Sequence, residues 1–205
     1  MAVSYEQQLL ETLLPQWHSL LQGWSADGSL VAAAQESLLL NGTPQPLTDL
    51  VTQWSAGDFS SLPPIVLLSS TDISGAMGAY ASTTGTIYLN QDWLKTATQD
   101  QVFAVLTEEL GHSLDALLNA VDTPGDEGEV FSFLLANSSN ASIDQQTVST
   151  VSDQISITVD GQQINAEAAA TPIIRGNSLY TLTSQTSSWT SAETESESLG
   201  GSLVK

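Results

Sequence analysis

The chain has 205 residues, of which 23 are Asp or Glu and 3 are Lys or Arg, so its formal net charge at pH 7 is −20. So few cations cannot neutralise a phosphate backbone, which argues against nucleic acid as a direct partner. The absence of cysteine excludes disulfides, thiolate metal sites and cysteine nucleophiles. No segment has the ~18 consecutive apolar residues that a membrane span requires. The N-terminus lacks the basic and apolar regions of a cleavable signal peptide.

The composition of the chain changes near residue 137. Residues 1–136 contain both histidines and four of the five tryptophans, whereas 23 of the 69 residues from Asn137 onward are Ser or Thr. This change predicts three parts: a compact domain over residues 1–136, a Ser/Thr-rich connector over residues 137–170, and a lighter segment over residues 171–205.

Hydrophobic spacing predicts an α+β fold that is mainly helical and has a small sheet. A first helix is expected over residues 5–21, with Pro15 kinking or splitting it. Two shorter helices and two strands are expected to follow, at residues 29–40, 47–54, 65–68 and 86–89. In the connector, residues 155–166 alternate around Asp160-Gly161, which is typical of a β-hairpin. A strand at 179–182 and a helix at 188–199 are expected near the end.

The clearest helix starts at Thr98, because Thr98-Gln99-Asp100-Gln101 fits a capping box. Its apolar stripe consists of Phe103, Leu106, Leu110, Leu114 and Leu117. At about 100° per residue, Glu108, His112 and Asp115 lie within roughly 60° of one another, nearly opposite that stripe. Gly111 costs about 1 kcal/mol against Ala in a helix interior, which indicates close approach of another backbone or of a ligand.

An acidic loop over residues 122–129 follows this helix and supports two interpretations. In the first, the Glu108 face is solvated, and Asp126 or Glu127 favours the start of the next helix through its dipole. In the second, Glu108 and His112, one turn apart, bind a divalent metal together with a carboxylate from the loop. The second interpretation predicts that Glu108 and His112 converge with at least one other acid. The candidates are Asp115, Asp122, Asp126, Glu127 and Glu129.

The strand at 86–89 followed by a helix with Glu109-Leu-Gly-His112 resembles the zincin metallopeptidases. In that family an edge strand holds the peptide substrate, and a helix with the motif HExxH binds zinc. The resemblance implies that Glu109 is the general base and that Thr86 and Tyr88 contact substrate. It also implies that His112 is a metal ligand. Together with the helix face and the acidic loop, we expect the metal ligands to be Glu108, His112, Asp115, Asp126 and Glu127.

The sequence departs from the zincin pattern at Glu108, where the family has its first histidine ligand. A carboxylate in that place is an unusual zinc ligand. Zinc is therefore one candidate ion, and calcium, which prefers oxygen ligands, is the alternative. A relative that keeps the fold without activity is a third reading.

A wider resemblance covers residues 47–135, through the phrases QWSAGDF, GAYASTTGTIYLNQDWL, VLTEELGHSLDALLN and DTPGDEGEVF. These phrases are similar to a module of large secreted proteins of cyanobacteria and related bacteria, described as calcium-binding, haemolysin-like or RTX-type. Glu-Glu-Leu-Gly-His-x-x-Asp is that module's own pattern, so Glu108 belongs to it. The resemblance implies a secreted or cell-surface location and the remainder of a larger protein as partner, while the lack of a signal peptide leaves the cytoplasm open.

The end of the chain, through RGNSLY, SWTSA and LGGSLV, resembles the opening of a C-type lectin-like domain. The second helix, the long loop and the calcium- and sugar-binding carboxylates of that fold have no counterpart here, so sugar binding does not carry over. The alternative is an amphipathic tail helix. About 35 residues cannot enclose a core, so residues from about 171 onward are expected to pack poorly.

Together these features predict a metallopeptidase-like module that hydrolyses peptide bonds with a divalent metal. The alternative is a non-catalytic adhesion or scaffold module that uses the acidic cluster structurally or for calcium. A peptidase needs Glu109 to face an open groove beside residues 86–89. A scaffold would have the acidic groups hydrogen-bonded internally, with no groove.

Overall fold

Residues 4–137, 153–169, 173–175 and 178–180 are described by the computed structural model of the chain. The fold is α+β and mainly helical, as the sequence predicts. The helices are α1 (Tyr5–Asp27), α2 (Ser29–Ser37), α3 (Gln45–Ser55), α4 (Gln91–Leu94), α5 (Gln99–Leu118) and α6 (Glu127–Ala136). The strands are β1 (Ile65–Leu68), β2 (Gly78–Ala81), β3 (Thr86–Asn90), β4 (Gln154–Val159), β5 (Gln162–Glu167), β6 (Ile173–Arg175) and β7 (Ser178–Tyr180). The helix predicted at 188–199 lies outside the described residues.

The larger of the two described sheets has five strands in the order β1-β3-β2-β5-β4. β1 runs parallel to β3, and the other neighbouring strands are antiparallel. The strand predicted at residues 86–89 is therefore β3, and it lies between β1 and β2. The expectation of a free edge strand there is wrong, because both sides of β3 already pair within the sheet.

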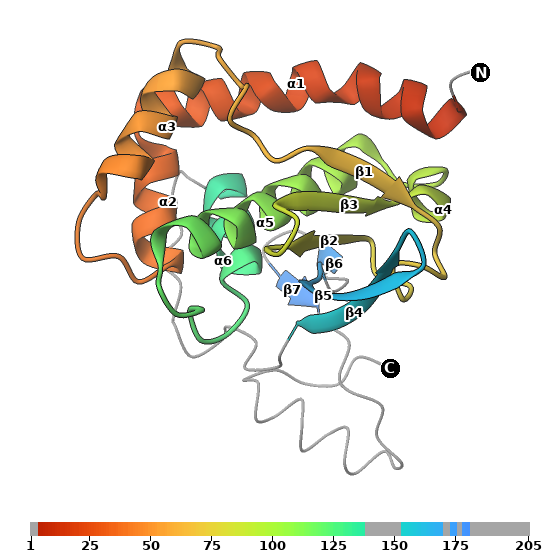
Figure 1. Ribbon diagram of the computed structural model, residues 1–205. Coiled ribbons are helices and arrows are strands. Elements are labelled where there is room, and N and C mark those ends of the chain that lie inside the picture. The colour runs from red at the N-terminus through yellow and green to blue at the C-terminus, as the bar shows by residue number, and fades with distance from the viewer. Residues whose placement is uncertain (1–3, 138–152, 170–172, 176–177, 181–205) are drawn as a thin grey trace.

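The predicted hairpin is confirmed as β4 and β5. Asp160 and Gly161 form its turn with φ values of 50° and 79°, the left-handed conformation that the Asp-Gly pair favours. β5 also pairs with β2, at Glu167 and Tyr80. The hairpin, which the composition assigns to a connector, thus extends the sheet formed by residues 65–90 (Figure 1).

Helix α1 runs through Pro15 without a break, so the predicted split is wrong. Pro15 is exposed, and water can bond the backbone carbonyl that the ring leaves unpaired. On the opposite face Leu13 and Trp17 are buried on either side of the proline and hold the helix against the core. Trp17 also donates a hydrogen bond from Nε1 to Thr107 Oγ1 of α5, at 3.0 Å.

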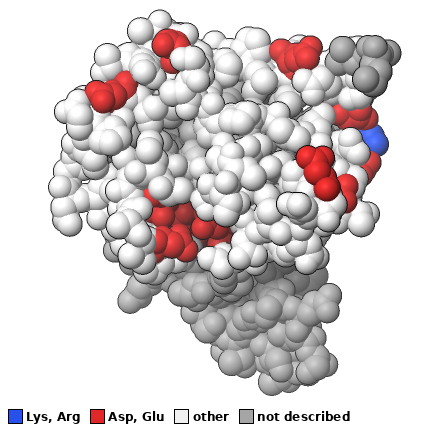
Figure 2. Space-filling model, in the orientation of Figure 1, with Lys and Arg blue, Asp and Glu red and all other residues white. Residues whose placement is uncertain are grey.

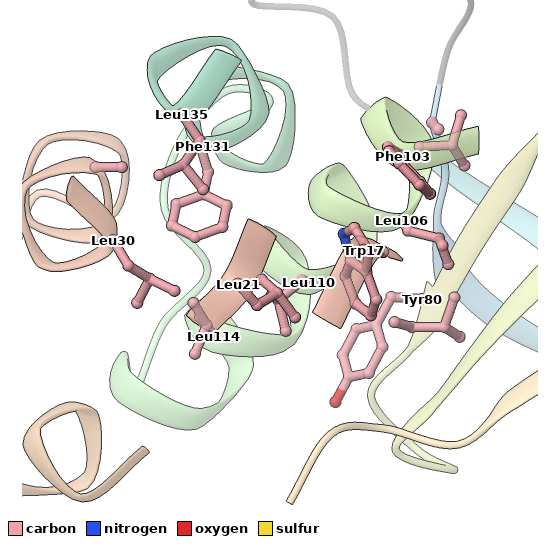
Figure 3. Close-up of a cluster of buried hydrophobic side chains, with 14 of the residues drawn as sticks. Trp17, Leu21, Leu30, Tyr80, Phe103, Leu106, Leu110, Leu114, Phe131 and Leu135 are labelled. Atoms are coloured by element: carbon pink, nitrogen blue, oxygen red, sulfur yellow. The ribbon is translucent and has the colours of Figure 1, made fainter. Parts of the chain in front are cut away.

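The main core lies where α1, α2, α5 and α6 meet one face of the sheet. Figure 3 shows side chains from these four helices and from β2 pointing into the same space. The labelled residues are Trp17, Leu21, Leu30, Tyr80, Phe103, Leu106, Leu110, Leu114, Phe131 and Leu135. Leu117, the last residue of the predicted stripe, is 54% exposed, so the buried stripe ends at Leu114. This core holds α5 rigidly between α6 and β2.

Candidate metal centre

Helix α5 carries the candidate site and begins as predicted, with the capping box between Thr98 and Gln101. From residue 102 to residue 115 every position except Ala104 is buried. Glu108, Glu109 and His112 are 2%, 0% and 0% exposed. The interpretation of this face as a solvated helix surface is therefore wrong. Carboxylates lie inside the protein here, where they need partners.

The acidic loop and the start of α6 bring further carboxylates to His112. Ligand atoms of Glu108, His112 and Asp126 all lie within 4.8 Å of one another. Asp126 caps α6, because its Oδ1 accepts a hydrogen bond from the backbone N–H of Glu129 at 2.8 Å. The predicted convergence of Glu108 and His112 with a loop carboxylate is confirmed.

The orientation of His112 is set by Glu127. Nδ1 of His112 lies 2.8 Å from Glu127 Oε1, so we assign a hydrogen bond from Nδ1–H to that carboxylate. Nε2 then faces Asp126 Oδ1 at 3.8 Å and Asp153 Oδ2 at 3.4 Å. A histidine that donates one ring N–H to a carboxylate and turns the other nitrogen toward a cation is the usual arrangement in metal sites.

Among the described residues, four buried side-chain atoms of the acids and the histidine named above have no hydrogen-bond partner. They are Glu108 Oε1, Glu109 Oε2, His112 Nε2 and Asp153 Oδ2. An unpartnered buried polar atom costs about 1–3 kcal/mol, and more when it is charged. A cation bound between Glu108, His112 and Asp126 would give Glu108 Oε1 and His112 Nε2 the partner that they lack. This cluster of Glu, His and Asp side chains could hold a metal ion.

The acids of the cluster hold their protons more tightly than free carboxyl groups do. Burial, together with the charges of Asp126 and Glu109, raises the pKa of Glu108 well above its usual value. Burial raises the pKa of Glu109 to about 8 and that of Asp153 to about 6. Burial alone would lower the pKa of His112, but Glu127 and the other carboxylates raise it well above its usual value. Metal binding would displace these protons.

Asp115, a predicted ligand, has a different role in the described contacts. Its Oδ1 accepts hydrogen bonds from Asn119 Nδ2 and Thr123 Oγ1, and its Oδ2 accepts one from the Thr123 backbone N–H. Asp115 therefore fixes the start of the acidic loop. It also lies near Asp122 and Glu127, with ligand atoms within 4.8 Å of one another.

The predicted substrate contacts Thr86 and Tyr88 do not lie at this site. Side chains alternate between the two faces of a strand. Ile87 and Leu89 of β3 belong to the core beneath α5, whereas Tyr88 packs in a second apolar cluster with Ile73 and Ile157. Thr86 and Tyr88 therefore point to the face away from α5, and the structure does not bring them to the metal cluster.

The strand that borders the site is β2, which the sequence analysis did not predict. A Cβ added to Gly78 would lie 2.7 Å from Glu109 Oε1. Two acids from the hairpin, Asp153 and Glu167, were also missed, and Glu167 Oε2 lies 3.6 Å from His112 Nδ1. Their one sequence signal is their position at the two ends of the hairpin.

Two glycines allow α5 and α6 to meet at the site. A Cβ on Gly111 would lie 2.8 Å from Gly128 Cα, which confirms the close backbone approach that the sequence indicates. A Cβ on Gly128 would lie 2.5 Å from His112 Nε2 and 2.7 Å from the Glu108 backbone oxygen. A side chain at either position would therefore separate the helices that carry the cluster.

Alanine at Gly111 is expected to lower the free energy of unfolding, measured in urea, although alanine favours a helix interior by about 1 kcal/mol. The reason is overpacking against a backbone atom, which typically costs about 1–3 kcal/mol. Gly23→Ala is the matched control, because Gly23 lies within α1 and an added Cβ meets nothing within 4 Å. A stabilisation by Gly111→Ala equal to that by Gly23→Ala would contradict the packing described here.

Figure 2 shows acidic side chains gathered at one place on the lower surface of the described residues, away from the blue lysine.

In the described part of the chain, no helix combines the length and apolar character needed to cross a bilayer. Comparisons with models of protein families, with curated proteins and with solved structures gave no match. The function is therefore argued from the site itself.

Proposed function

We propose that this chain is a divalent-metal module of the metallopeptidase type. The observation that carries the proposal is that ligand atoms of Glu108, His112 and Asp126 lie within 4.8 Å of one another, while Glu108 Oε1 and His112 Nε2 have no hydrogen-bond partner among the described residues. An imidazole nitrogen among carboxylates favours zinc, whereas calcium takes oxygen ligands alone and is the alternative ion. As the resemblances imply, the module would belong to a larger secreted or cell-surface protein.

The chain's own side chains divide into holding, orienting and reacting groups. Glu108, His112 and Asp126 would hold the ion, Asp153 Oδ2 lies beside them at 3.4 Å from His112 Nε2, and Glu127 orients His112. A bound divalent ion supplies an acidic water and polarises a carbonyl oxygen.

Glu109 is the proposed general base. Its Oε2 has no hydrogen-bond partner among the described residues, so that oxygen is free to accept a proton from water. Peptide hydrolysis needs a group of this kind beside the metal-bound water.

Zinc titration of the purified chain by calorimetry tests the metal part of the proposal. Glu127→Gln is expected to weaken zinc binding by about 10–100-fold, because it removes the carboxylate that orients His112. Glu36→Gln, which changes an exposed acid of α2, is the control and should bind zinc as the unaltered chain does. Equal affinities in all three proteins would contradict the site.

Glu109→Gln is expected to bind zinc but to hydrolyse a quenched fluorescent peptide about 10²–10⁴-fold more slowly than the unaltered chain. The amide keeps the shape of the side chain and cannot accept the proton of a water molecule. Unchanged hydrolysis in Glu109→Gln would show that Glu109 is not the base.

The rival function is a scaffold in which the ion only stabilises the fold. The near-complete burial of Glu108, Glu109 and His112 favours this reading, since a structural site needs no access for substrate. In a scaffold, zinc would raise the melting temperature of the unaltered chain and of Glu109→Gln, and neither protein would hydrolyse peptide.

A further inference from the structure

A cavity of about 290 Å³ lies beside α5, on the far side of that helix from the metal cluster. Its walls are formed by α3, by residues 61–64, by Tyr80 of β2 and by the C-terminal half of α5. Leu110 and Leu114 line it from α5, and at about 100° per residue they lie nearly opposite the helix positions that carry the cluster. The cavity is therefore separate from the candidate metal centre.

The walls of the cavity are tied to their neighbours by hydrogen bonds. Trp54 Nε1 of α3 donates to Ser61 Oγ at 3.0 Å, which joins α3 to the wall segment. The backbone N–H of Ile87 donates to the Pro64 backbone oxygen at 3.0 Å, which joins the same segment to β3. The rings of Pro63 and Pro64 also fix the φ angles of that segment. A ligand would therefore meet a cavity that is already formed.

The lining of the cavity is mainly apolar and carries no charge at neutral pH. Trp54, Leu110 and Leu114 are each 1% exposed and form its buried part. None of the described residues that line it is an acid or a base, although the chain has 23 Asp or Glu residues. An ion placed here would lose its hydration without gaining an opposite charge. The cavity therefore favours an uncharged ligand.

Tyr80 gives the cavity a polar group that lacks a partner. The side chain is 7% exposed, and its hydroxyl makes no hydrogen bond with the described residues. Figure 3 shows that hydroxyl pointing away from Trp17 and Leu106, out of the apolar cluster. Burial, and then the charge of Glu167, raise the pKa of Tyr80, so the hydroxyl keeps its proton. A buried O–H group needs an acceptor, and a ligand in the cavity can supply one.

The volume of the cavity indicates the size of that ligand. A cavity of about 150 Å³ lined by aliphatic and aromatic side chains binds one benzene molecule. The cavity beside α5, at about 290 Å³, therefore has room for roughly two fused rings. Trp54 offers a ring for offset or edge-to-face contact with an aromatic ligand.

We propose that this cavity binds a small, uncharged molecule of two fused rings, and that the Tyr80 hydroxyl donates a hydrogen bond to an acceptor atom of that molecule. The acceptor is a carbonyl oxygen, an ether oxygen or a ring nitrogen. The site goes beyond the proposed metal function and requires no ion, so each can fail without the other.

The first test compares two probes that differ in one oxygen atom. α-Tetralone is a two-ring ketone, and tetralin has the same rings without the ketone. Nuclear magnetic resonance of the full, isotope-labelled chain follows the indole N–H signal of Trp54, which is expected to shift saturably with either probe. Tyr80→Phe is expected to weaken α-tetralone binding by about 2–10-fold and to change tetralin binding by less than about twofold, because only the ketone loses a hydrogen bond.

A second variant tests the place of binding without altering a buried residue. Leu117 lines the cavity from α5 and is 54% exposed, so a larger side chain there can narrow the opening without disturbing the core. Leu117→Trp is expected to weaken the binding of both probes at least about tenfold. Leu20→Trp is the control, because Leu20 is 39% exposed on α1 and does not line the cavity. It should bind both probes as the unaltered chain does.

A Trp54 signal that does not shift saturably with α-tetralone would overturn the inference. Equal weakening of both probes in Tyr80→Phe would also overturn it, as would unchanged binding in Leu117→Trp. Two further ligands test the chemical class. Naphthoate has two rings and a negative charge, and binding as tight as that of α-tetralone would contradict an uncharged ligand. Tighter binding of N-acetyltryptophanamide would show that the cavity receives a side chain of another protein, and would overturn the proposal of a small molecule.

Discussion

Replacement of His112 by alanine is expected to abolish zinc binding and to lower the free energy of unfolding by about 3–5 kcal/mol. His112 is fully buried and contacts Glu127, Asp126 and Asp153, so its loss leaves buried carboxylates without their positive partner. Both effects come from one side chain, because the imidazole ring of His112 would bind the ion and is also the partner of the neighbouring carboxylates. Calorimetric zinc titration and unfolding in urea measure the two quantities.

His18→Ala is the matched control, because His18 is the only other histidine of the chain. His18 is partly buried and stacks on Phe59, with ring centroids 4.4 Å apart, and it belongs to none of the groups that could hold a metal ion among the described residues. It should keep zinc binding and lose little stability. Zinc binding by His112→Ala with the affinity of the unaltered chain would contradict the assignment of His112.

Removal of metal is expected to make the protein strongly pH-dependent, with lower stability at pH 8 than at pH 5. Burial raises the pKa of Glu109 to about 8 and the pKa values of Glu129 and Glu167 to about 7. Between about pH 4.5 and pH 8 the folded state therefore holds protons that the unfolded state has lost. The free energy of unfolding must then fall as the pH rises.

His112 acts in the same direction as the carboxyls. Its pKa is raised in the folded state, so its contribution to stability is present below about pH 6.5 and is lost as the pH rises through the folded-state value. Zinc replaces these protons and should therefore stabilise the chain by much more at pH 8 than at pH 5.

Scanning calorimetry at both pH values, with EDTA and with zinc, measures this difference. Citrate is avoided as a buffer because it chelates the ion. A chain that is more stable in EDTA at pH 8 than at pH 5 would contradict the assignment of the buried protonated cluster.

The helix that carries the site was predictable from local sequence. The capping residues Thr98 and Gln101 and the spacing of Glu108 and His112 depend only on neighbours along one helix, and both agree with the structure. The meeting of His112 with Asp126 followed from the short loop between α5 and α6. Local rules were enough where the partners were near in sequence.

Burial of the polar face could not be read from helical spacing. A face with Glu108, His112 and Asp115 has the pattern of a solvent-exposed surface, and the sequence alone does not reveal that α6 and the hairpin cover it. Asp153 was missed for the same reason: its contact with His112 depends on how β5 pairs with β2, far along the chain.

The position of β3 illustrates the limit for strands. Residues 86–89 have the sequence pattern of a strand, but whether that strand lies at the edge of the sheet depends on which other strands pair with it. In β2, Gly78, Ala79 and Ala81 have little strand preference, and Tyr80 alone is too short a signal to mark a strand. Without β2, the sequence could not show which strand lies against Glu109.

The most direct test of the metal centre is native mass spectrometry of the purified chain with one equivalent of zinc. The account predicts one zinc ion bound per chain, and none in a variant that combines Glu108→Gln with His112→Ala. A folded, unaltered chain that binds no zinc and no calcium would contradict the account, because the buried carboxylates and His112 would then be stable without an ion.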